Sequence, residues 1–390
     1  MTAVENRTSS SSSATPAPAR GRRPWGRPQL YTGYGQDMAL LNTGAKKVGL
    51  AVLLVVALLL PFLLEDELLR LLATGAVLAI GAIGLNLVTG YAGQVSLGHA
   101  FFLGIGAYTA AVVSGDPEDD RLYGLGITFL PVWLLAGGLV AALVGLVVAP
   151  LASRLRGLYL AIVTLGLVFL GTHVFNEWDA VTGGIGVGRP AADPVLFGVD
   201  LSRRTDAFSA DQQLYLLMTV LLVGFALLGR NIARSAIGRS FAAVRDRDIA
   251  AEVTGVDVRK VKRRAFVISG FYAGCAGALL YSITGYLDPS SFGLLLSVQF
   301  VAMVLIGGVS TISGSILGAY FIALLPRLTR ELPEYLPFLS SSATQTPNVF
   351  QVETLLYGLL IVAFLLLEPR GLFGLWVRIR NYWKAWPFSY

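Results

Sequence analysis

The sequence predicts an all-α, polytopic integral membrane protein with about ten transmembrane helices. Three observations lead to this fold class. Hydrophobic residues make up 55% of the 390 residues and charged residues only 14%, where soluble domains carry about a quarter. The mean hydropathy is +0.66. Long stretches lack charge altogether, and the stretch 71–115 contains no Asp, Glu, Lys or Arg.

Apolar runs locate the individual spans, because a helix needs roughly 20 apolar residues to cross the hydrocarbon core. The run 71–115 is long enough for two helices, and 289–326 predicts two short segments. One span each is predicted in the remaining runs, 48–64, 122–153, 157–176, 212–229, 265–287 and 349–367. Glycine- and serine-interrupted segments in both halves predict an internal, inverted repeat of the kind that transporters use.

The distribution of Lys and Arg predicts the topology. With a cytoplasmic N-terminus and ten crossings, 23 of the 30 basic residues face the cytoplasm. We therefore expect both termini inside, in the inner or plasma membrane of a cell. The predicted regions are a disordered basic tail at 1–46 with an interfacial helix within 31–42, a transmembrane domain at 47–374 and a cytoplasmic tail at 375–390. The domain would hold a cytoplasmic loop at 230–264 and external loops at 177–211 and 327–348.

Missing motifs exclude several kinds of chemistry. No G-x-x-x-x-G-K-[ST] motif is present, so the chain is not expected to bind ATP by that device. Two histidines and one cysteine predict no metal site, and His99 and His173 have no evident catalytic partner at membrane depth. We therefore expect neither an enzyme nor a cofactor. The net charge of +6 follows membrane topology, so nucleic acid is not an expected partner.

Two glycine-rich stretches are candidates for a solute path. In the first, GYAGQVSLGH at 90–99, the candidates are Gln94, Ser96 and His99. In the second, GGVSTISGS at 307–315, they are Gly308 and Ser310. Each stretch fits a broken helix that turns its backbone toward a solute. Each fits equally a turn between closely packed helices, and for His99 a hydrogen-bonded packing role is favoured.

The basic loop at 230–264 is a candidate docking element that reads as helical. The candidates within it are a pair of alanines, their charged neighbours and the following glycine: Asp248, Ala250, Ala251, Glu252 and Gly255. A small apolar patch that ends at a glycine suits insertion into a groove on a partner. The alternative is a solvated basic loop on anionic lipid, which is favoured for residues 259–264.

Four segments in order resemble the LivM-type permease subunits of branched-chain amino acid ABC importers. They are GYAGQVSLGHAFFLGIGAY at 90–108, the segment 245–266, the segment 306–320 and EPRGL at 368–372. The similarity covers roughly residues 48–374 and leaves the N-terminal tail outside.

The resemblance implies a heteromeric importer that works by alternating access. This subunit would form the translocation path for branched-chain amino acids beside a second, related permease. Two ATPase subunits would bind and hydrolyse ATP, and an external binding protein would deliver the solute. ABC permeases often carry E-A-A-x-x-x-G at the ATPase contact, and here Ile249 stands in place of the glutamate. A urea or short-amide importer, a secondary carrier and a passive channel remain alternatives.

Overall fold

A computed structural model describes residues 44–155, 157–196, 198–205, 208–330, 349–368 and 370–385. The chain divides into two compact units, 1–51 and 52–390. Of the first unit, the described residues are 44–51, which form the beginning of helix α2 (Gly44–Leu59). The interfacial helix predicted within 31–42 and nearly all of the predicted tail lie outside the described residues. Everything below concerns the second unit.

Helices make up most of the second unit. Its first part contains the single turn η1 (Leu60–Phe62), α3 (Asp66–Asn86), the π-helical turn η2 (Leu87–Tyr91), α4 (His99–Ser114), α5 (Leu130–Arg154), α6 (Leu158–Glu177) and α7 (Asp179–Thr182). Asp66 and Glu67 lie in the first turn of α3, where negative charge is favourable beside the partial positive charge of the helix N-terminus. Four two-residue strands form two antiparallel pairs, β1 (Arg189–Pro190) with β4 (Tyr286–Leu287) and β2 (Val195–Leu196) with β3 (Val199–Asp200).

The second part of the unit begins with a capped helix. Ser209 and Gln212 form a capping box at the start of α8, which satisfies two backbone N–H groups. The elements from there are α8 (Ala210–Arg234), α9 (Ala236–Asp246), α10 (Asp248–Val253), α11 (Val258–Thr284), η3 (Pro289–Phe292), α12 (Leu294–Gly307), α13 (Ile312–Arg330), α15 (Val349–Leu367) and α16 (Gly371–Ala385).

The predicted all-α membrane fold is confirmed. Five helices in the described part of the chain are long and apolar enough to cross a membrane: α3 with η2, α5, α6, α8 and α11. Five shorter apolar helices accompany them, at Val48–Phe62, His99–Ser114, Leu294–Gly307, Ile312–Arg327 and Thr354–Phe364. The two short segments predicted in 289–326 are α12 and α13.

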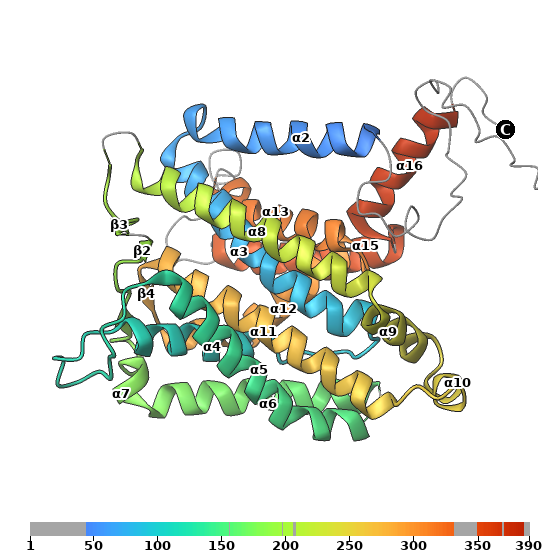
Figure 1. The fold of residues 1–390 in the computed structure, drawn as a ribbon, viewed down its shortest axis with the longest axis horizontal. Coiled ribbons are helices and arrows are strands. Elements are labelled where there is room, and N and C mark those ends of the chain that lie inside the picture. Colours follow the sequence, from blue (N-terminus) through green and yellow to red (C-terminus); the bar gives the residue numbers. More distant parts are fainter. Residues whose placement is uncertain are drawn as a thin grey trace, which may run out of the picture. The chain divides into compact units, whose positions relative to one another are not determined.

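Small residues let the central helices approach each other closely. Helix α11 packs against α4 and α5 (Figure 1). A Cβ atom on Gly274 would lie 2.3 Å from the carbonyl oxygen of Gly137, and one on Gly106 would lie 2.1 Å from the carbonyl oxygen of Gly274. Backbones this close are typical of helix contacts inside membranes, where van der Waals packing replaces the hydrophobic driving force.

The structure differs from the predicted boundaries in several places. The segment 230–264 is helical, as predicted, and it includes parts of two long apolar helices: it holds the end of α8, α9, α10 and the start of α11. Residues 259–264 therefore lie in the first turns of α11, where Lys262 is only 3% exposed. The predicted tail at 375–390 begins inside α16, and the predicted loop at 177–211 contains α7, three strands and the start of α8. Of the loop at 327–348, residues 327–330 belong to α13 and the others lie outside the described residues.

Candidate functional site

The two glycine-rich stretches meet at one end of the bundle. Asn86, the last residue of α3, is fully buried and points at the loop between α12 and α13. Its Nδ2 donates to the carbonyl oxygen of Thr311 at 2.9 Å and to Ser315 Oγ at 2.7 Å. Its Oδ1 accepts a hydrogen bond from the backbone N–H of Ser310 at 2.9 Å. One amide side chain thus joins helices that are more than 200 residues apart in sequence.

Ser310 holds an uncommon backbone conformation at this junction. Its φ is +60°, a left-handed value that non-glycine residues rarely adopt and that surrounding contacts must maintain. Besides the bond from its N–H to Asn86, its hydroxyl donates to the carbonyl oxygen of Gly90 at 2.7 Å. Gly90 must be small here, because a Cβ atom would lie 2.0 Å from Asn86 Oδ1 and 2.6 Å from Ser310 N.

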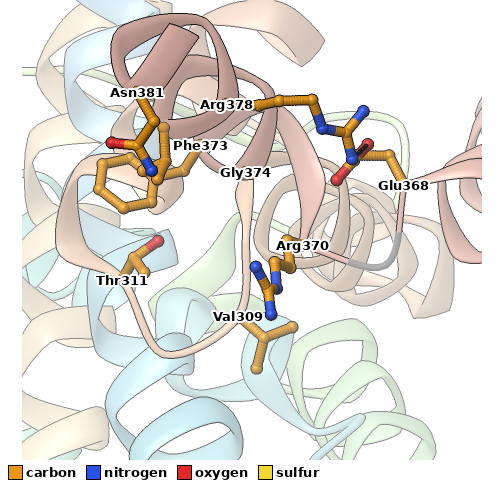
Figure 2. A pocket seen from close by; sticks show the side chains of 9 residues that line it. Val309, Thr311, Glu368, Arg370, Phe373, Gly374, Arg378 and Asn381 are labelled. Atoms are coloured by element: carbon orange, nitrogen blue, oxygen red, sulfur yellow. Dashed lines mark ion pairs between the residues drawn. The ribbon is translucent and has the colours of Figure 1, made fainter. Parts of the chain in front are cut away.

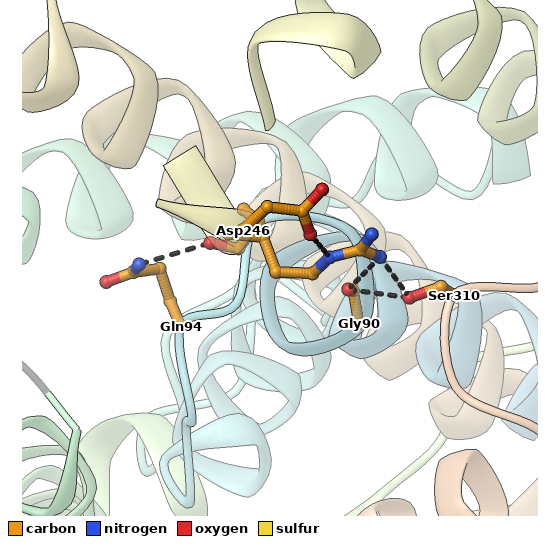
Figure 3. Close-up of polar contacts among 6 residues, drawn as sticks. Gly90, Gln94, Asp246 and Ser310 are labelled. Carbon is orange, nitrogen blue, oxygen red and sulfur yellow. Dashed lines mark hydrogen bonds and ion pairs between the residues drawn. The ribbon is translucent and has the colours of Figure 1, made fainter. Parts of the chain in front are cut away.

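Arg245, near the end of α9, completes the junction, at which Figure 3 shows Gly90, Asp246 and Ser310. Its Nη1 donates to Ser310 Oγ at 2.9 Å and to the carbonyl oxygen of Gly90 at 3.3 Å. Its Nε donates to Asp246 Oδ1 at 2.9 Å, and its side chain is 36% exposed. We call Asn86, Gly90, Arg245 and Ser310 the Arg245 clamp. Sequence reasoning found Ser310 but missed Arg245, because the contact spans 155 residues of sequence.

Helix α10, which holds most of the predicted docking residues, starts three residues after Arg245. Ala251 is buried at 4% exposure, whereas Ala250 and Glu252 are exposed. Asp248 begins the helix, and its Oδ1 accepts the backbone N–H of Ile249 at 2.9 Å. Gly255 follows α10 with φ +86°, and a Cβ atom there would meet nothing within 4 Å.

The outer face of α10 carries two exposed aliphatic side chains, which the sequence analysis did not single out. Ile249 is 68% exposed and Val253 is 84% exposed. Residues four apart lie on the same face of a helix, so these two side chains form one uncovered ridge. The ridge includes the position at which the docking pattern of ABC permeases has glutamate. A signal was present in the sequence, namely two large aliphatic residues at helical spacing among charges.

The other candidates for a solute path are buried, and Gln94 lies beside the Arg245 clamp, because a Cβ atom on the preceding Gly93 would lie 2.8 Å from Arg245 Cγ. His99 is 1% exposed; its Nε2 donates to the carbonyl oxygen of Gly81 at 2.9 Å, and its ring packs edge-on against Phe300. Gln94 donates to the carbonyl oxygen of Ala92 at 3.1 Å, and Ser96 Oγ accepts the N–H of Gly98 at 3.4 Å. These contacts describe packing and turn formation, and a role of these residues in translocation stays a prediction.

Gly308, the remaining candidate, lies beside the start of α16. Its φ of +127° is one that side-chain-bearing residues rarely adopt. A Cβ atom there would lie 2.8 Å from the carbonyl oxygen of Arg370. Gly308 and Ser310 therefore lie in one loop, in which Gly308 contacts the start of α16 and Ser310 contacts Arg245.

A second arginine junction lies at the other end of the bundle and was also missed from sequence. Arg189 is 2% exposed; its Nη2 donates to the carbonyl oxygens of Ala111 at 2.6 Å and Tyr123 at 2.7 Å, and its Nη1 to that of Val181 at 3.0 Å. Burial lowers the pKa of its guanidinium. We call these four residues the Arg189 clamp. Its only sequence signal is a lone arginine in the run GGIGVGRPAA.

The apolar helices define a multi-pass membrane protein, and comparison with known proteins identifies its family. The family model described as "Branched-chain amino acid transport system / permease component" matches residues 67–366. The high-affinity branched-chain amino acid permease LivM of Escherichia coli is 32% identical over 348 residues, which cover 85% of this chain and 76% of that protein. The chain belongs to this permease family.

More distant relatives show how broad the similarity is. A probable branched-chain amino acid permease LivH of Methanocaldococcus jannaschii is 25% identical and covers 82% of this chain and 97% of its own length. The ribose import permease RbsC of Haemophilus influenzae is 26% identical over 68% of this chain and 77% of its own. No solved structure matches the chain.

Proposed function

We propose that the chain is the membrane-spanning permease subunit of an ATP-driven importer and forms the path for branched-chain amino acids. Membership of the permease family supports the transport role. Because a ribose permease is also a relative, the family likeness leaves the solute open. The branched-chain assignment rests on LivM, which is 32% identical across 85% of the chain.

The observation that carries ATP-driven transport is the uncovered ridge of Ile249 and Val253 on α10. Two large aliphatic side chains on a short, charged, solvent-facing helix suit a hydrophobic groove on a partner. The partner we propose is one of two ATPase subunits, which would bind the ATP while this chain needs no cofactor. The flanking charges of Asp248 and Glu252 would orient the helix in the groove. An ATPase on this side makes the α10 end cytoplasmic, together with both termini.

The Arg245 clamp gives that docking a mechanical consequence. A displacement of α10 moves Arg245, whose guanidinium contacts Gly90 after α3 and Ser310 between α12 and α13. A single displacement of α10 by the ATPase would therefore move both glycine-rich stretches. The two ends of this path would open alternately, with different affinities for the solute in each state. A second permease and an external binding protein would complete the assembly.

A reconstitution experiment tests this function. The chain is co-expressed with candidate ATPases, a second permease and a binding protein, and uptake of leucine into proteoliposomes is followed with and without ATP. Val253→Arg places a charge in the ridge and should abolish ATPase co-purification and uptake. The matched control is Val187→Arg, since Val187 is 69% exposed in the connection between α7 and β1, at the end opposite α10.

Two outcomes would contradict the proposal. Uptake by the chain alone without ATP would show a carrier or channel. Retained ATPase binding in Val253→Arg, equal to that of Val187→Arg, would remove α10 as the docking element. Competition by valine and isoleucine, but not by urea or ribose, would support the solute class.

A further inference from the structure

A cavity of about 470 Å³ lies between the loop that contains Ser310 and the beginning of α16. Figure 2 shows its charged side chains, Glu368, Arg370 and Arg378. The family match ends at residue 366, so the lining residues of the cavity from Glu368 to Asn381 lie beyond the matched region. The docking and coupling described above do not use this cavity.

The charges around the cavity leave one cation uncompensated. Arg378 Nη2 is 2.7 Å from Glu368 Oε2, and the Glu368 side chain is only 9% exposed, so these two groups neutralise each other. Arg370 has no ion pair or side-chain hydrogen bond with any residue that the structure describes. Its guanidinium lies between Val309 and the Glu368–Arg378 pair (Figure 2). The net charge of the lining residues is therefore +1. The hydrogen-bond donors left over for a ligand are the N–H groups of the planar Arg370 guanidinium.

The remaining walls combine an amide with apolar surface. Asn381, from the third turn of α16, contributes an amide group. Val309, Phe373 and Val377 contribute the apolar part of the lining. A ligand that fits these walls has a singly charged anionic group for Arg370 and an apolar portion that continues past the valines and the phenylalanine.

The position of the cavity indicates where such a ligand comes from. Helix α15 is apolar and ends at Leu367, and α16 begins at Gly371. Helix α16 exposes Trp376, Ile379 and Tyr382, which are three residues apart and share a face. Exposed aromatic residues beside arginines are typical of helices at the boundary between hydrocarbon and headgroups. The cavity thus opens where the chain leaves the apolar core of the bilayer.

We propose that this cavity binds the phosphodiester group of an anionic phospholipid. A phosphodiester carries one negative charge, which matches the net charge of the lining, and a guanidinium donates two parallel hydrogen bonds to phosphate. Basic pockets between membrane helices bind acidic headgroups in this way. A zwitterionic lipid also brings a cation, and the carboxylate that would receive it, Glu368, is already paired with Arg378.

The bound headgroup would also hold Ser310 of the Arg245 clamp in position through α16. This consequence rests on the proposed function. A Cβ atom on Gly371 would lie 2.7 Å from the backbone nitrogen of Gly308. The start of α16 and the loop that carries Ser310 therefore move together. A lipid that holds α16 in place holds Ser310 where Arg245 reaches it, so ATP-driven uptake should be faster in membranes that contain acidic lipid.

Lipid retention on the purified chain tests the binding. Native mass spectrometry counts molecules of phosphatidylglycerol and of phosphatidylcholine with the same acyl chains that remain bound. The wild type should retain one phosphatidylglycerol in preference to phosphatidylcholine. Arg370→Met should weaken this retention about tenfold, which corresponds to one charge-assisted contact of about 1.4 kcal/mol. The matched control, Arg380→Met, removes an exposed arginine of α16 that does not line the cavity.

Three results would overturn the proposal. Equal loss of lipid in Arg370→Met and Arg380→Met would show general attraction to a basic helix. Unchanged retention in Arg370→Met would remove the cavity as the site. Displacement of the bound phosphatidylglycerol by millimolar inorganic phosphate would identify a soluble anion as the occupant. The measurement needs neither ATPase nor solute, so its failure is distinct from failure of the proposed function.

Discussion

The two arginine clamps hold opposite ends of the same bundle in different ways. Arg189 is 2% exposed and donates to three backbone carbonyl oxygens, all at 3.0 Å or less. Arg245 has a side chain that is 36% exposed, a bond of 3.3 Å to Gly90 and a neighbouring carboxylate, Asp246, that shares its donors. Figure 1 shows α7, β2, β3 and β4 at one end and α9 and α10 at the other.

The difference separates a fixed end from an adjustable one. Hydrogen bonds from a charged group are strongest where water is excluded, and a buried carbonyl that loses its donor is costly. Contacts near solvent exchange more easily with water and are weaker. We therefore expect the Arg189 clamp to contribute mainly to stability and the Arg245 clamp to change with the position of α10. The four predictions below test this distinction, from the largest expected effect to the smallest.

Removing Arg189 should have the largest effect on stability. Arg189→Met leaves the carbonyl oxygens of Ala111, Tyr123 and Val181 without this donor, and unsatisfied buried groups of this kind cost about 1–3 kcal/mol each, with incomplete additivity. We expect the melting temperature of the purified chain to fall by roughly 5–10 °C. Arg203→Met is the control, because its side chain is 80% exposed and pairs only with Asp200 at the surface. Similar melting temperatures for the two variants would contradict a structural role for Arg189.

Removing Arg245 should affect transport more than stability. In the assembled importer, Arg245→Met should lower solute uptake about tenfold while ATP hydrolysis continues, because the link from α10 to Gly90 and Ser310 is lost. Arg245→Lys keeps the charge but not the planar donor geometry, so its uptake should lie between those of the wild type and of Arg245→Met. Uptake and ATP hydrolysis are measured on the same preparation. An equal decrease of both would indicate lost assembly and would argue against a coupling role.

Two glycines with similar backbone conformations isolate the contact with Arg245. Gly93 has φ +67° and Gly285 has φ +73°. A Cβ atom on Gly93 would lie 2.8 Å from Arg245 Cγ, whereas one on Gly285 would meet nothing within 4 Å. Both alanine variants carry about 1–2 kcal/mol of backbone strain, but only Gly93→Ala displaces Arg245.

We therefore expect uptake in Gly93→Ala to be about fivefold lower than in Gly285→Ala, a coupling difference of about 1 kcal/mol. Both variants are compared at equal amounts of assembled complex, so that expression does not enter the ratio. Equal uptake in the two variants would mean that the position of Arg245 does not limit transport.

The smallest predicted effect is a local dependence on pH beside α10. Asp257 caps α11, and the hydrogen bond from the backbone N–H of Lys260 holds the pKa of this carboxylate below its usual value. A lowered pKa means that the stabilisation is complete above the unfolded pKa of about 4 and is lost as pH falls through the folded pKa. Amide exchange at the start of α11, corrected for intrinsic rates, should therefore increase in acid.

The cap of α9 provides the control for that measurement. In α9 the hydroxyl of Ser235 accepts the backbone N–H of Ile237 and does not titrate, and the first turn of α9 holds no acidic residue, so that turn should show no such change over the same pH range. Asp257→Asn keeps a good capping residue without a titrating group and should remove the pH dependence at α11. A wild-type dependence that persists in Asp257→Asn would place its origin elsewhere.

The helices could be predicted from the sequence because apolar runs and charge breaks are local signals. The two short segments in 289–326 and the helical character of 230–264 followed from them. The clamps could not be predicted in this way, since Arg245 contacts Gly90 across 155 residues and Arg189 contacts Ala111 across 78. The glycine-rich stretches were found, but their partners depend on how α3, α9 and α13 pack.

The buried amide of Asn86 has a consequence for how the protein is made. Its partner Ser310 is synthesised 224 residues later, which takes roughly 10–45 s at ordinary translation rates. During this interval a polar group at the end of an apolar span has to bond to water, to headgroups or to the insertion machinery. Helices α12 and α13 in turn need Asn86 to satisfy the turn between them. Correct insertion of α12 and α13 thus depends on how the end of α3 is solvated until these helices are made.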